Sequence, residues 1–393
     1  MINETMYGLG NAPSAIRELF AYGLERKAEI GEDKVFDFSI GNPSVPAPDK
    51  VAKTMHELAD MPPAQLHAYS PASGLDETKT AIAGNLNRRF GTDYAAKNFY
   101  LTTGAASCLS CCINAVIVDP GDEIIVISPY FPEYRVWIEA DGGTCVEVPA
   151  REDNFQIDLD ALAAAINERT RAVIINSPNN PVGVVYTRET LEGLAEVLYT
   201  KRKEFGSSLF LISDEPYREL AYGPEVSWVP SIYDNTLVCY SWSKSLSLPG
   251  DRIGYVLVPN EVEESERVMF AVAGAGRALG YICAPVFFQR VIAACVDEPV
   301  NASAYAANRE LLTQGLDELG YHYIAPDGAF YLWMQALEPD AQAFSDKAKE
   351  HELLLVPSDS FGVGGWVRVS YCVSADVIRN SMPAFAALKR DYE

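Results

Sequence analysis

An α/β fold, with helices packed on a mostly parallel sheet, is predicted by the pattern of apolar segments along this chain of 393 residues. Short runs rich in β-branched residues alternate with longer segments of helical character. The runs are apolar throughout, which is expected when helices cover both faces of a sheet. The chain is too long for one ordinary core and 48% of it is hydrophobic, so we expect two domains.

The elements of this sheet follow in order along the chain. Residues 159–166 come after Asp158 and residues 188–205 come after Thr187, and both segments are expected to be helices because a side-chain oxygen precedes each one and can cap it. The apolar runs that we interpret as strands are residues 124–127, 172–175, 209–212, 237–240 and 253–258.

Polar residues follow three of these strands. They are residues 176–180, Asp214 and residues 241–244. Ligands of such sheets bind beyond the carboxyl ends of the strands, so a site is expected there. Strand-end loops are polar in many proteins, and the identity of the residues must therefore carry the argument.

The net charge of the chain limits the kinds of partner that it can bind. The formal net charge is −23, with 31 Lys and Arg against 54 Asp and Glu, which argues against binding to nucleic acid or to an anionic membrane surface. The longest apolar stretch, residues 269–288, is interrupted by Arg277 and Pro285 and is not expected to span a bilayer. Residues 1–30 carry charges without an apolar block, so no signal peptide is expected.

Eight cysteines are scattered through apolar segments without the spacing of a small secreted disulfide framework. A reducing compartment is therefore favoured, and we expect a cytoplasmic protein. Cys108, Cys111 and Cys112 fall on one face of a predicted helix, with no histidine nearby. Buried packing is the favoured interpretation of these three, and no metal site is expected.

A lysine flanked by hydroxyl side chains lies in the stretch SWSKSLSLPGDRIG, residues 241–254, directly after an apolar strand. A lysine on such a tight loop loses solvation, so its pKa falls below about 10.4 and it can form an imine with an aldehyde. Ser241 and Arg252 can then hold a phosphate dianion beside Lys244. A surface lysine next to a turn is the alternative for a bare SxSK, but the full stretch has far fewer accidental matches.

A second phosphate-binding feature precedes an apolar helix expected to run to about Val118. The sequence TTGAAS, residues 102–107, leads into this helix. Free backbone N–H groups and the positive end of the helix would therefore face a ligand at Gly104, Ala105 and Ala106. A glycine before a helix is common, and it is the presence of Lys244 that makes the phosphate interpretation the favoured one.

Residues 241–254, together with the loop SPNNPVG at residues 177–183, resemble the lysine and asparagine motifs of the class I and II aminotransferases, which are fold type I pyridoxal phosphate enzymes. The resemblance covers nearly the whole chain. It implies pyridoxal 5'-phosphate as cofactor and the transfer of an amino group from an L-amino acid to a 2-oxo acid, with Lys244 joined to the cofactor as an imine. A homodimer with shared active sites is also implied.

The resemblance also implies the domain organisation. A large cofactor domain with a mostly parallel sheet of the seven-stranded type is expected at residues 45–285. Residues 1–44 together with residues 286–393 are expected to form a smaller α+β domain.

In such relatives the cofactor ring is held by strand-end residues, and the matching positions are clear in this chain. Asp214 would pair with the protonated pyridine nitrogen, which lets the cofactor accept carbanion electrons. Asn180 and Tyr217 would hydrogen-bond its phenolic oxygen. Phe131 would stack on the ring, with Tyr130 as the alternate. A capping role is the structural alternative for Asp214.

The resemblance also implies which residues are catalytic and which bind the cofactor. Tyr69 corresponds to a tyrosine that reaches the partner subunit's phosphate, and Lys244 is the expected proton shuttle at Cα. The catalytic set is Lys244, Asp214 and Tyr217; the cofactor set is Tyr69, Gly104, Ala105, Ala106, Tyr130, Phe131, Asn180, Asp214, Tyr217, Ser241, Ser243, Lys244 and Arg252.

The substrate is expected to be held by its α-carboxylate. Arg368, in an alternating strand, matches the substrate arginine of the family, and its planar fork suits a carboxylate. Gly41 and Asn180 match positions that approach the same group. Arg277 is considered as a second carboxylate ligand, because dicarboxylate-specific relatives carry an arginine in the matching region, although not in this local pattern.

The same residues suit other outcomes. A carbon–sulfur β-lyase or an enzyme like aminocyclopropane-carboxylate synthase would use nearly the same set. A catalytically inactive, ligand-sensing regulatory protein is an alternative from a different class. It is disfavoured because no winged-helix DNA-binding segment precedes Tyr69, because the chain is acidic, and because Lys244 is intact.

Overall fold

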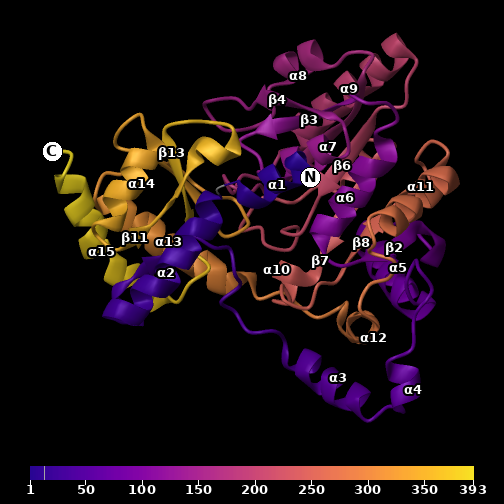
Figure 1. Cartoon of the computed structure of the whole chain (residues 1–393), viewed down its shortest axis with the longest axis horizontal. Coiled ribbons are helices and arrows are strands. Elements are labelled where there is room, and N and C mark those ends of the chain that lie inside the picture. The colour runs from indigo at the N-terminus through magenta and orange to yellow at the C-terminus, as the bar shows by residue number, and fades with distance from the viewer. Residues whose placement is uncertain (13) are drawn as a thin grey trace.

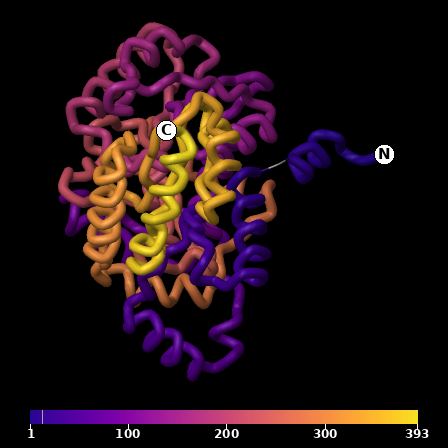
Figure 2. The backbone as a smooth tube through the Cα atoms, turned by 90° about the vertical axis from the view of Figure 1, so that its left-hand side faces the viewer, coloured from indigo at the N-terminus to yellow at the C-terminus, as the bar shows by residue number. Residues whose placement is uncertain are grey.

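The computed structural model describes residues 1–12 and 14–393 and places them in two lobes (Figure 1). The lobe on the right of Figure 1 is built on a sheet of seven strands. The lobe on the left is built from both ends of the chain, whose indigo and yellow segments lie side by side (Figures 1 and 2). There β1 (Phe36–Asp37) pairs in parallel with β11 (Leu353–Leu354).

The large sheet has the strand order β2-β8-β7-β6-β5-β3-β4. Its strands are β2 (Phe99–Thr102), β3 (Glu123–Ser128), β4 (Thr144–Pro149), β5 (Thr170–Asn176), β6 (Phe210–Asp214), β7 (Thr236–Ser241) and β8 (Gly254–Leu257). Neighbouring strands from β4 to β7 are parallel, whereas β8 is antiparallel to both β2 and β7. The prediction of a mostly parallel sheet is confirmed. β8 reverses direction because no helix that could carry a crossover separates it from β7.

Helices cover both faces of this sheet, which explains its fully apolar strands. Ile124 and Val126 pack with α6 and α7 on one face, whereas Ile125 and Ile127 pack with α8 and α9 on the other. These helices are α5 (Asp76–Phe90), α6 (Ala105–Val116), α7 (Glu133–Ala140), α8 (Leu159–Ala165), α9 (Arg188–Phe205), α10 (Trp242–Ser245), α11 (Ser265–Ala278) and α12 (Val286–Cys295).

The two helices expected from their caps are present. Asp158 accepts from the backbone N–H of Ala161 at the start of α8, and Thr187 accepts from that of Thr190 at the start of α9. The helix after Gly104 ends at Val116, two residues before its expected end at Val118.

The smaller sheet is antiparallel, with the order β12-β13-β10-β9. Its strands are β9 (Tyr323–Ile324), β10 (Tyr331–Gln335), β12 (Val356–Pro357) and β13 (Trp366–Ser370). The remaining helices are α1 (Glu4–Asn11), α2 (Ala15–Ile30), α3 (Asp49–Ala59), α4 (Pro63–Leu66), α13 (Ala302–Glu318), α14 (Ala341–Lys349) and α15 (Ala375–Arg390). α12 packs on α3 and α5 beside the large sheet. The expected domain boundary at residue 286, just before this helix, stays a prediction.

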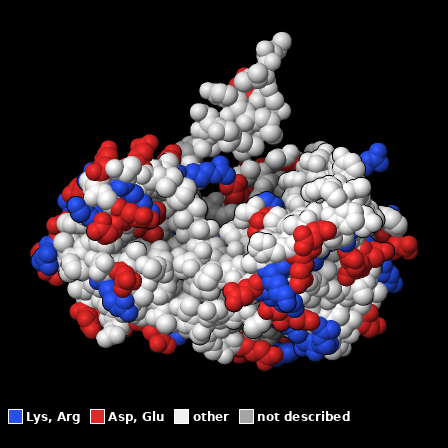
Figure 3. All heavy atoms as spheres, turned by 90° about the horizontal axis from the view of Figure 1, so that it is seen from below, with Lys and Arg blue, Asp and Glu red and all other residues white. Residues whose placement is uncertain are grey.

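Helix α1 stands apart from both lobes (Figure 2), and none of its residues is buried. Seen from below, it projects over a hollow between the lobes (Figure 3). Within residues 1–12 and 14–393, no helix combines the length and apolar character needed to cross a membrane. The three clustered cysteines of α6 are fully buried, in agreement with the packing interpretation.

Candidate active site

A cavity of about 290 Å³ lies where the carboxyl ends of the parallel strands meet the smaller lobe. It gathers residues that are far apart in sequence, from Ile16 in α2 to Arg368 in β13. The predicted site residues that line it are Gly41, Ala105, Ala106, Phe131, Asn180, Asp214, Tyr217, Ser241, Ser243, Lys244, Arg252 and Arg368. One cavity thus brings together twelve of the expected side chains and backbone segments.

Lys244 lies on α10, a single helical turn that follows β7 directly. Its Nζ donates a hydrogen bond to the backbone oxygen of Gly41, at 2.6 Å. Burial is the main cause that lowers the pKa of Lys244 to about 8; Cys372 raises this pKa, and the guanidinium groups of Arg368 and Arg252 contribute to lowering it. A substantial fraction of neutral amine is therefore present near neutral pH, which an imine-forming lysine or a general base requires.

Arg252 lies against the start of α6, where the phosphate cradle is expected. Gly104 has a φ of +93°, and a Cβ on this residue would lie 2.7 Å from Nη2 of Arg252. The guanidinium donates to the backbone oxygen of Pro249 at 2.8 Å. Ser241 donates to the hydroxyl of Ser243 at 3.1 Å. Gly104 itself does not line the cavity. Because it has no Cβ, it lets the guanidinium of Arg252 approach the start of α6.

Asp214 ends β6 and is buried. One carboxylate oxygen, Oδ2, accepts a hydrogen bond from the hydroxyl of Tyr134 at 2.6 Å. The other, Oδ1, has no partner in the described structure. Burial raises the pKa of Asp214 to about 7, although the Tyr134 bond opposes this. A buried carboxylate with a free oxygen is suited to a cationic ligand group, which would restore its charged form.

The end of β5 holds the adjacent loop in place. Asn176 donates through its side chain to the backbone oxygen of Asp214 at 2.8 Å. Its side-chain oxygen accepts from the backbone N–H of Asn180 at 2.7 Å. Asn176 therefore couples the two neighbouring strand ends that carry the predicted ring-binding residues.

Arg368 is buried between the two lobes. Its Nη1 donates to the side-chain oxygen of Asn180 at 3.1 Å, and its Nη2 donates to the backbone oxygen of Ser39 at 2.6 Å. Its guanidinium lies 4.5 Å from the ring centre of Tyr331, whose hydroxyl lies 3.0 Å from that of Tyr217. Nε has no partner. Among the described residues, no carboxylate forms an ion pair with the guanidinium of Arg368. An anionic ligand could therefore be its ionic partner.

The two aromatic candidates separate clearly. Phe131 lines the cavity. Tyr130 turns away, because its hydroxyl donates to Glu147 at 2.7 Å and accepts from Arg135 at 3.1 Å. Phe131 is therefore the better placed of the two to cover a ring, and the alternate assignment to Tyr130, whose hydroxyl is held by Glu147, stays a prediction.

Two further expected residues lie outside the cavity. Tyr69 is 94% exposed. Arg277 is exposed on the last turn of α11. Neither residue lines the cavity of its own chain, so the expected contact of Tyr69 depends on a partner subunit and stays a prediction. The suggestion of a distal carboxylate ligand at Arg277 finds no support within this chain.

Sequence reasoning missed three aromatic residues of the site. Tyr134 bonds Asp214, and Trp137 and Tyr331 line the cavity. Tyr134 and Trp137 share one face of α7, three residues apart, a spacing that could have signalled their joint placement. No local signal marks Tyr331, which reaches the site only through the pairing of β10 with β13.

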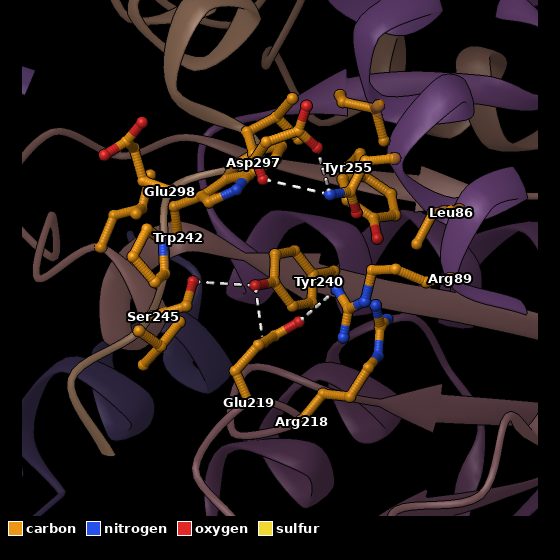
Figure 4. A pocket seen from close by; sticks show the side chains of 16 residues that line it. Leu86, Arg89, Arg218, Glu219, Tyr240, Trp242, Ser245, Tyr255, Asp297 and Glu298 are labelled. Atoms are coloured by element: carbon orange, nitrogen blue, oxygen red, sulfur yellow. Dashed lines mark hydrogen bonds and ion pairs between the residues drawn. The ribbon is translucent and has the colours of Figure 1, made fainter. Parts of the chain in front are cut away.

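A second cavity, of about 350 Å³, lies on the opposite side of α10 (Figure 4). Trp242 and Ser245 face this cavity, whereas Ser243 and Lys244 face the first. The hydroxyl of Tyr240 donates to the carboxylate of Glu219 and accepts from the hydroxyl of Ser245, each at 2.8 Å, as the dashed lines in Figure 4 show. The short helix that carries Lys244 is thus held from behind by a polar network.

Two ion pairs complete this network. Arg218 pairs with Glu215, and its guanidinium lies 4.7 Å from the ring centre of Tyr240. Arg89 pairs with Glu219 at 2.9 Å. The polar groups here are paired mainly with one another, so the arrangement supports the active site and is not itself shaped around an anion.

Metal chemistry is not suggested by the described side chains. In the part of the chain that the structure describes, no group of three His, Cys, Asp or Glu side chains is placed to hold a metal ion. The eight cysteines there are all free.

The cavity has the charge pattern of a pyridoxal phosphate site, with an anion cradle at one end, a buried carboxylate at the other and a lysine of lowered pKa between lobes. Residues 33–385 match the family described as Aminotransferase class I and II. The chain belongs to this family. It is therefore a pyridoxal phosphate-dependent aminotransferase.

Relatives of known name agree with this assignment. The chain is 31% identical to the aspartate/prephenate aminotransferase of Thermus thermophilus over 384 residues, which cover 95% of each protein. It is 30% identical to the aspartate aminotransferase of Thermotoga maritima over 368 residues, 91% of this chain and 93% of that one.

Solved structures agree as well. A crystal structure of an aminotransferase from Eubacterium rectale has a TM-score of 0.97 and 54% identity, and covers 100% of this chain and 99% of that one. The Thermus thermophilus aspartate aminotransferase with maleate has a TM-score of 0.87 and 29% identity, with 99% of each chain covered.

Proposed function

We propose that the cavity around Lys244 carries out both half-reactions of transamination, with Lys244 as the group that moves the proton at the substrate Cα. The observation that supports this most directly is that one cavity holds a lysine of lowered pKa, a free carboxylate oxygen of Asp214 and the buried cation of Arg368. These three groups match the three charges that a bound amino acid and cofactor bring together.

The residues present fit pyridoxal phosphate. Arg252 and the start of α6 would hold its phosphate, and Asp214 would hold its ring nitrogen. Asn180 and Tyr217 would hold its phenolic oxygen, while Phe131 would cover its ring. When bound, the cofactor supplies an electron sink that makes the α-proton of an attached amino acid acidic.

The protein's own groups have distinct tasks in this reaction. Arg368 binds the α-carboxylate and fixes the amino acid in one orientation, with Asn180 and the backbone near Gly41 beside it. Lys244 is close enough to Gly41 to hydrogen-bond its carbonyl, so its amine lies next to the substrate-binding segment. As a neutral amine it can take the α-proton and return it elsewhere.

The experiment that tests this proposal separates transamination from elimination. Each candidate amino acid is added to the cofactor-loaded protein without an oxo acid acceptor, and products are analysed. We expect stoichiometric 2-oxo acid and the amine form of the cofactor. Catalytic release of ammonia would instead identify a lyase.

The assembly expected from the family is a homodimer. The high exposure of Tyr69, and of α1 with its apolar side chains, supports a contact with a second copy. A cytoplasmic location is supported by the eight free cysteines, which suit a reducing compartment.

A further inference from the structure

The wall of the active-site cavity beyond Lys244 bears on which amino acids this enzyme accepts. We propose that its preferred donors carry an uncharged, apolar side chain, and that dicarboxylic amino acids are poor donors. This inference rests on the proposed function of the cavity, in particular on the binding of the α-carboxylate by Arg368.

The cations that line the cavity are all assigned to other groups. They are Lys244, Arg252 and Arg368 among the described residues. Lys244 meets the reacting carbon, Arg252 lies at the phosphate cradle, and Arg368 remains for the α-carboxylate. A side-chain carboxylate entering this site would lose its water without gaining a cation from the same subunit, which is costly in a partly buried setting.

Part of the remaining wall is apolar. Ile16 from α2, Ile40 and Trp137 from α7 line the same cavity as Arg368. Ile40 is 36% exposed, so this segment presents apolar surface that a substrate side chain could cover. Contact with such surface favours aromatic or branched aliphatic groups through the removal of apolar area from water.

A further cation, Arg17, follows Ile16 directly in α2, and it is already paired with a carboxylate. Its Nη2 pairs with Glu133 at 3.1 Å, and its side chain is 76% exposed. A substrate carboxylate at this place would meet the negative charge of Glu133 and a well-solvated partner. Arg17 therefore does not form a fixed second carboxylate site.

The overall electrostatics act in the same direction. The formal net charge of −23 disfavours the approach of a doubly negative ligand. Figure 3 shows acidic side chains on both lobes, whereas the surface between them is largely uncharged. The inference separates this chain from the relatives that are named for aspartate.

The first test measures binding without chemistry. The cofactor-loaded protein is titrated in a calorimeter with 3-phenylpropionate, which has one carboxylate and an apolar tail, and with succinate, which has two carboxylates. We expect succinate to bind at least about tenfold more weakly. Equal or tighter binding of succinate would overturn the proposal, whether or not the protein transaminates.

The second test follows single half-reactions by the absorbance change from the aldehyde to the amine form of the cofactor. In this step the amino nitrogen leaves the donor Cα for the cofactor, the aldehyde oxygen leaves as water, and another water supplies the new carbonyl oxygen. We expect phenylalanine, leucine or methionine to react at least about 100-fold more efficiently than aspartate or glutamate. Faster dicarboxylates overturn the specificity alone, whereas failure of every donor overturns the proposed function.

Matched variants locate the cause. Ile16→Arg should improve succinate binding and aspartate turnover, because it places a cation on the apolar wall, while Ile16→Leu should leave the preference unchanged. Arg17→Gln should also leave the preference unchanged. A selective loss of aspartate turnover in Arg17→Gln or Arg277→Gln would reveal a second carboxylate ligand and overturn the proposal.

Discussion

The lowered pKa of Lys244 follows from its position more than from its neighbours in sequence. A lysine in water is protonated at neutral pH, but burial beside two guanidinium groups lowers its pKa to about 8. The same burial raises the pKa of Asp214 to about 7. Burial thus disfavours the charged forms of both Lys244 and Asp214, and a ligand group of opposite charge would favour the charged form of each.

Replacement of Lys244 tests its role as proton carrier. We expect Lys244→Ala to retain cofactor binding through Arg252 and Asp214, but to exchange the α-proton of a bound amino acid at least about 100-fold more slowly. Exchange is measured by NMR in heavy water. Borohydride should attach the cofactor to residue 244 of the wild type only. Exchange at the wild-type rate in the variant would remove Lys244 from this role.

The raised pKa of Asp214 predicts how the stability of the cofactor-free protein depends on pH. The folded state holds this proton up to about pH 7, whereas an unfolded chain releases it near its ordinary value of 3.8. Between these values the unfolded state binds fewer protons, so stability falls as pH rises, by at most about 1.4 kcal/mol per pH unit.

The variant Asp214→Asn lacks this proton and should lose that part of the pH dependence. Urea unfolding of both proteins without cofactor, at about pH 5 and about pH 8, measures the difference. We expect the variant to gain stability relative to the wild type at the higher pH. Parallel pH profiles of the two proteins would show that Asp214 titrates normally.

At the scale of elements, α10 gains its orientation from the strand before it. Tyr240 in β7 bonds Ser245 in α10, and Glu219 shares the same hydroxyl (Figure 4). The helix is a single turn and has few bonds of its own to keep it in place. The network behind it therefore sets the direction in which Lys244 points.

Removal of one hydroxyl tests this positioning. Tyr240→Phe should lower kcat by about tenfold with little change in KM for the amino acid, because the lysine is less well oriented. The matched control is Tyr233→Phe, which removes a buried hydroxyl that donates to Leu209 at 2.6 Å, away from the cavity. Both should lose about 1–3 kcal/mol of stability. Equal kcat values in the two variants would contradict a positioning role for Tyr240.

Helices and strands that a local sequence pattern marks could be predicted from the sequence. Features that depend on pairing between strands far apart in the chain could not. The caps at Asp158 and Thr187 and the apolar run of β6 are local signals, and each appears where expected. The motif around Lys244 is also local. The reversal of β8 depends on which strands it pairs with, which no single segment reveals.

The same distinction holds within the site. Gly104, Asp214 and Lys244 were found because each follows a strand or precedes a helix. Tyr331 could not be found, since it reaches the cavity through the register of β10 against β13. The sequence does not separate Phe131 from its alternate Tyr130, because which of two adjacent aromatic rings lines the cavity depends on a remote carboxylate, Glu147.

At the scale of the whole molecule, the expected dimer joins two sites. Tyr69 is exposed and lines no part of its own active-site cavity, which suits a residue that serves the neighbouring subunit. In a symmetric pair, each subunit would then give one tyrosine and receive one.

Mixed dimers test this exchange. A variant with Lys244→Ala and one with Tyr69→Ala should each have low activity. Unfolding and refolding them together should restore about a quarter of wild-type activity, because half the dimers formed at random contain one intact site. Activity is measured before and after mixing, and light scattering measures the mass. Absence of recovery, with dimers present, would place Tyr69 outside the partner's site.

The smaller lobe takes strands from both ends of the chain, and this affects synthesis. When the ribosome has made the chain as far as β8, the strand that carries Asp214 and the short helix that carries Lys244 are complete. β1 still lacks β11, and the backbone oxygen of Phe38 lacks its donor at Ser370. A prematurely terminated product would therefore keep the lysine but lack Arg368, and its unpaired N-terminal segment would be exposed to chaperones and proteases until the last strands arrive.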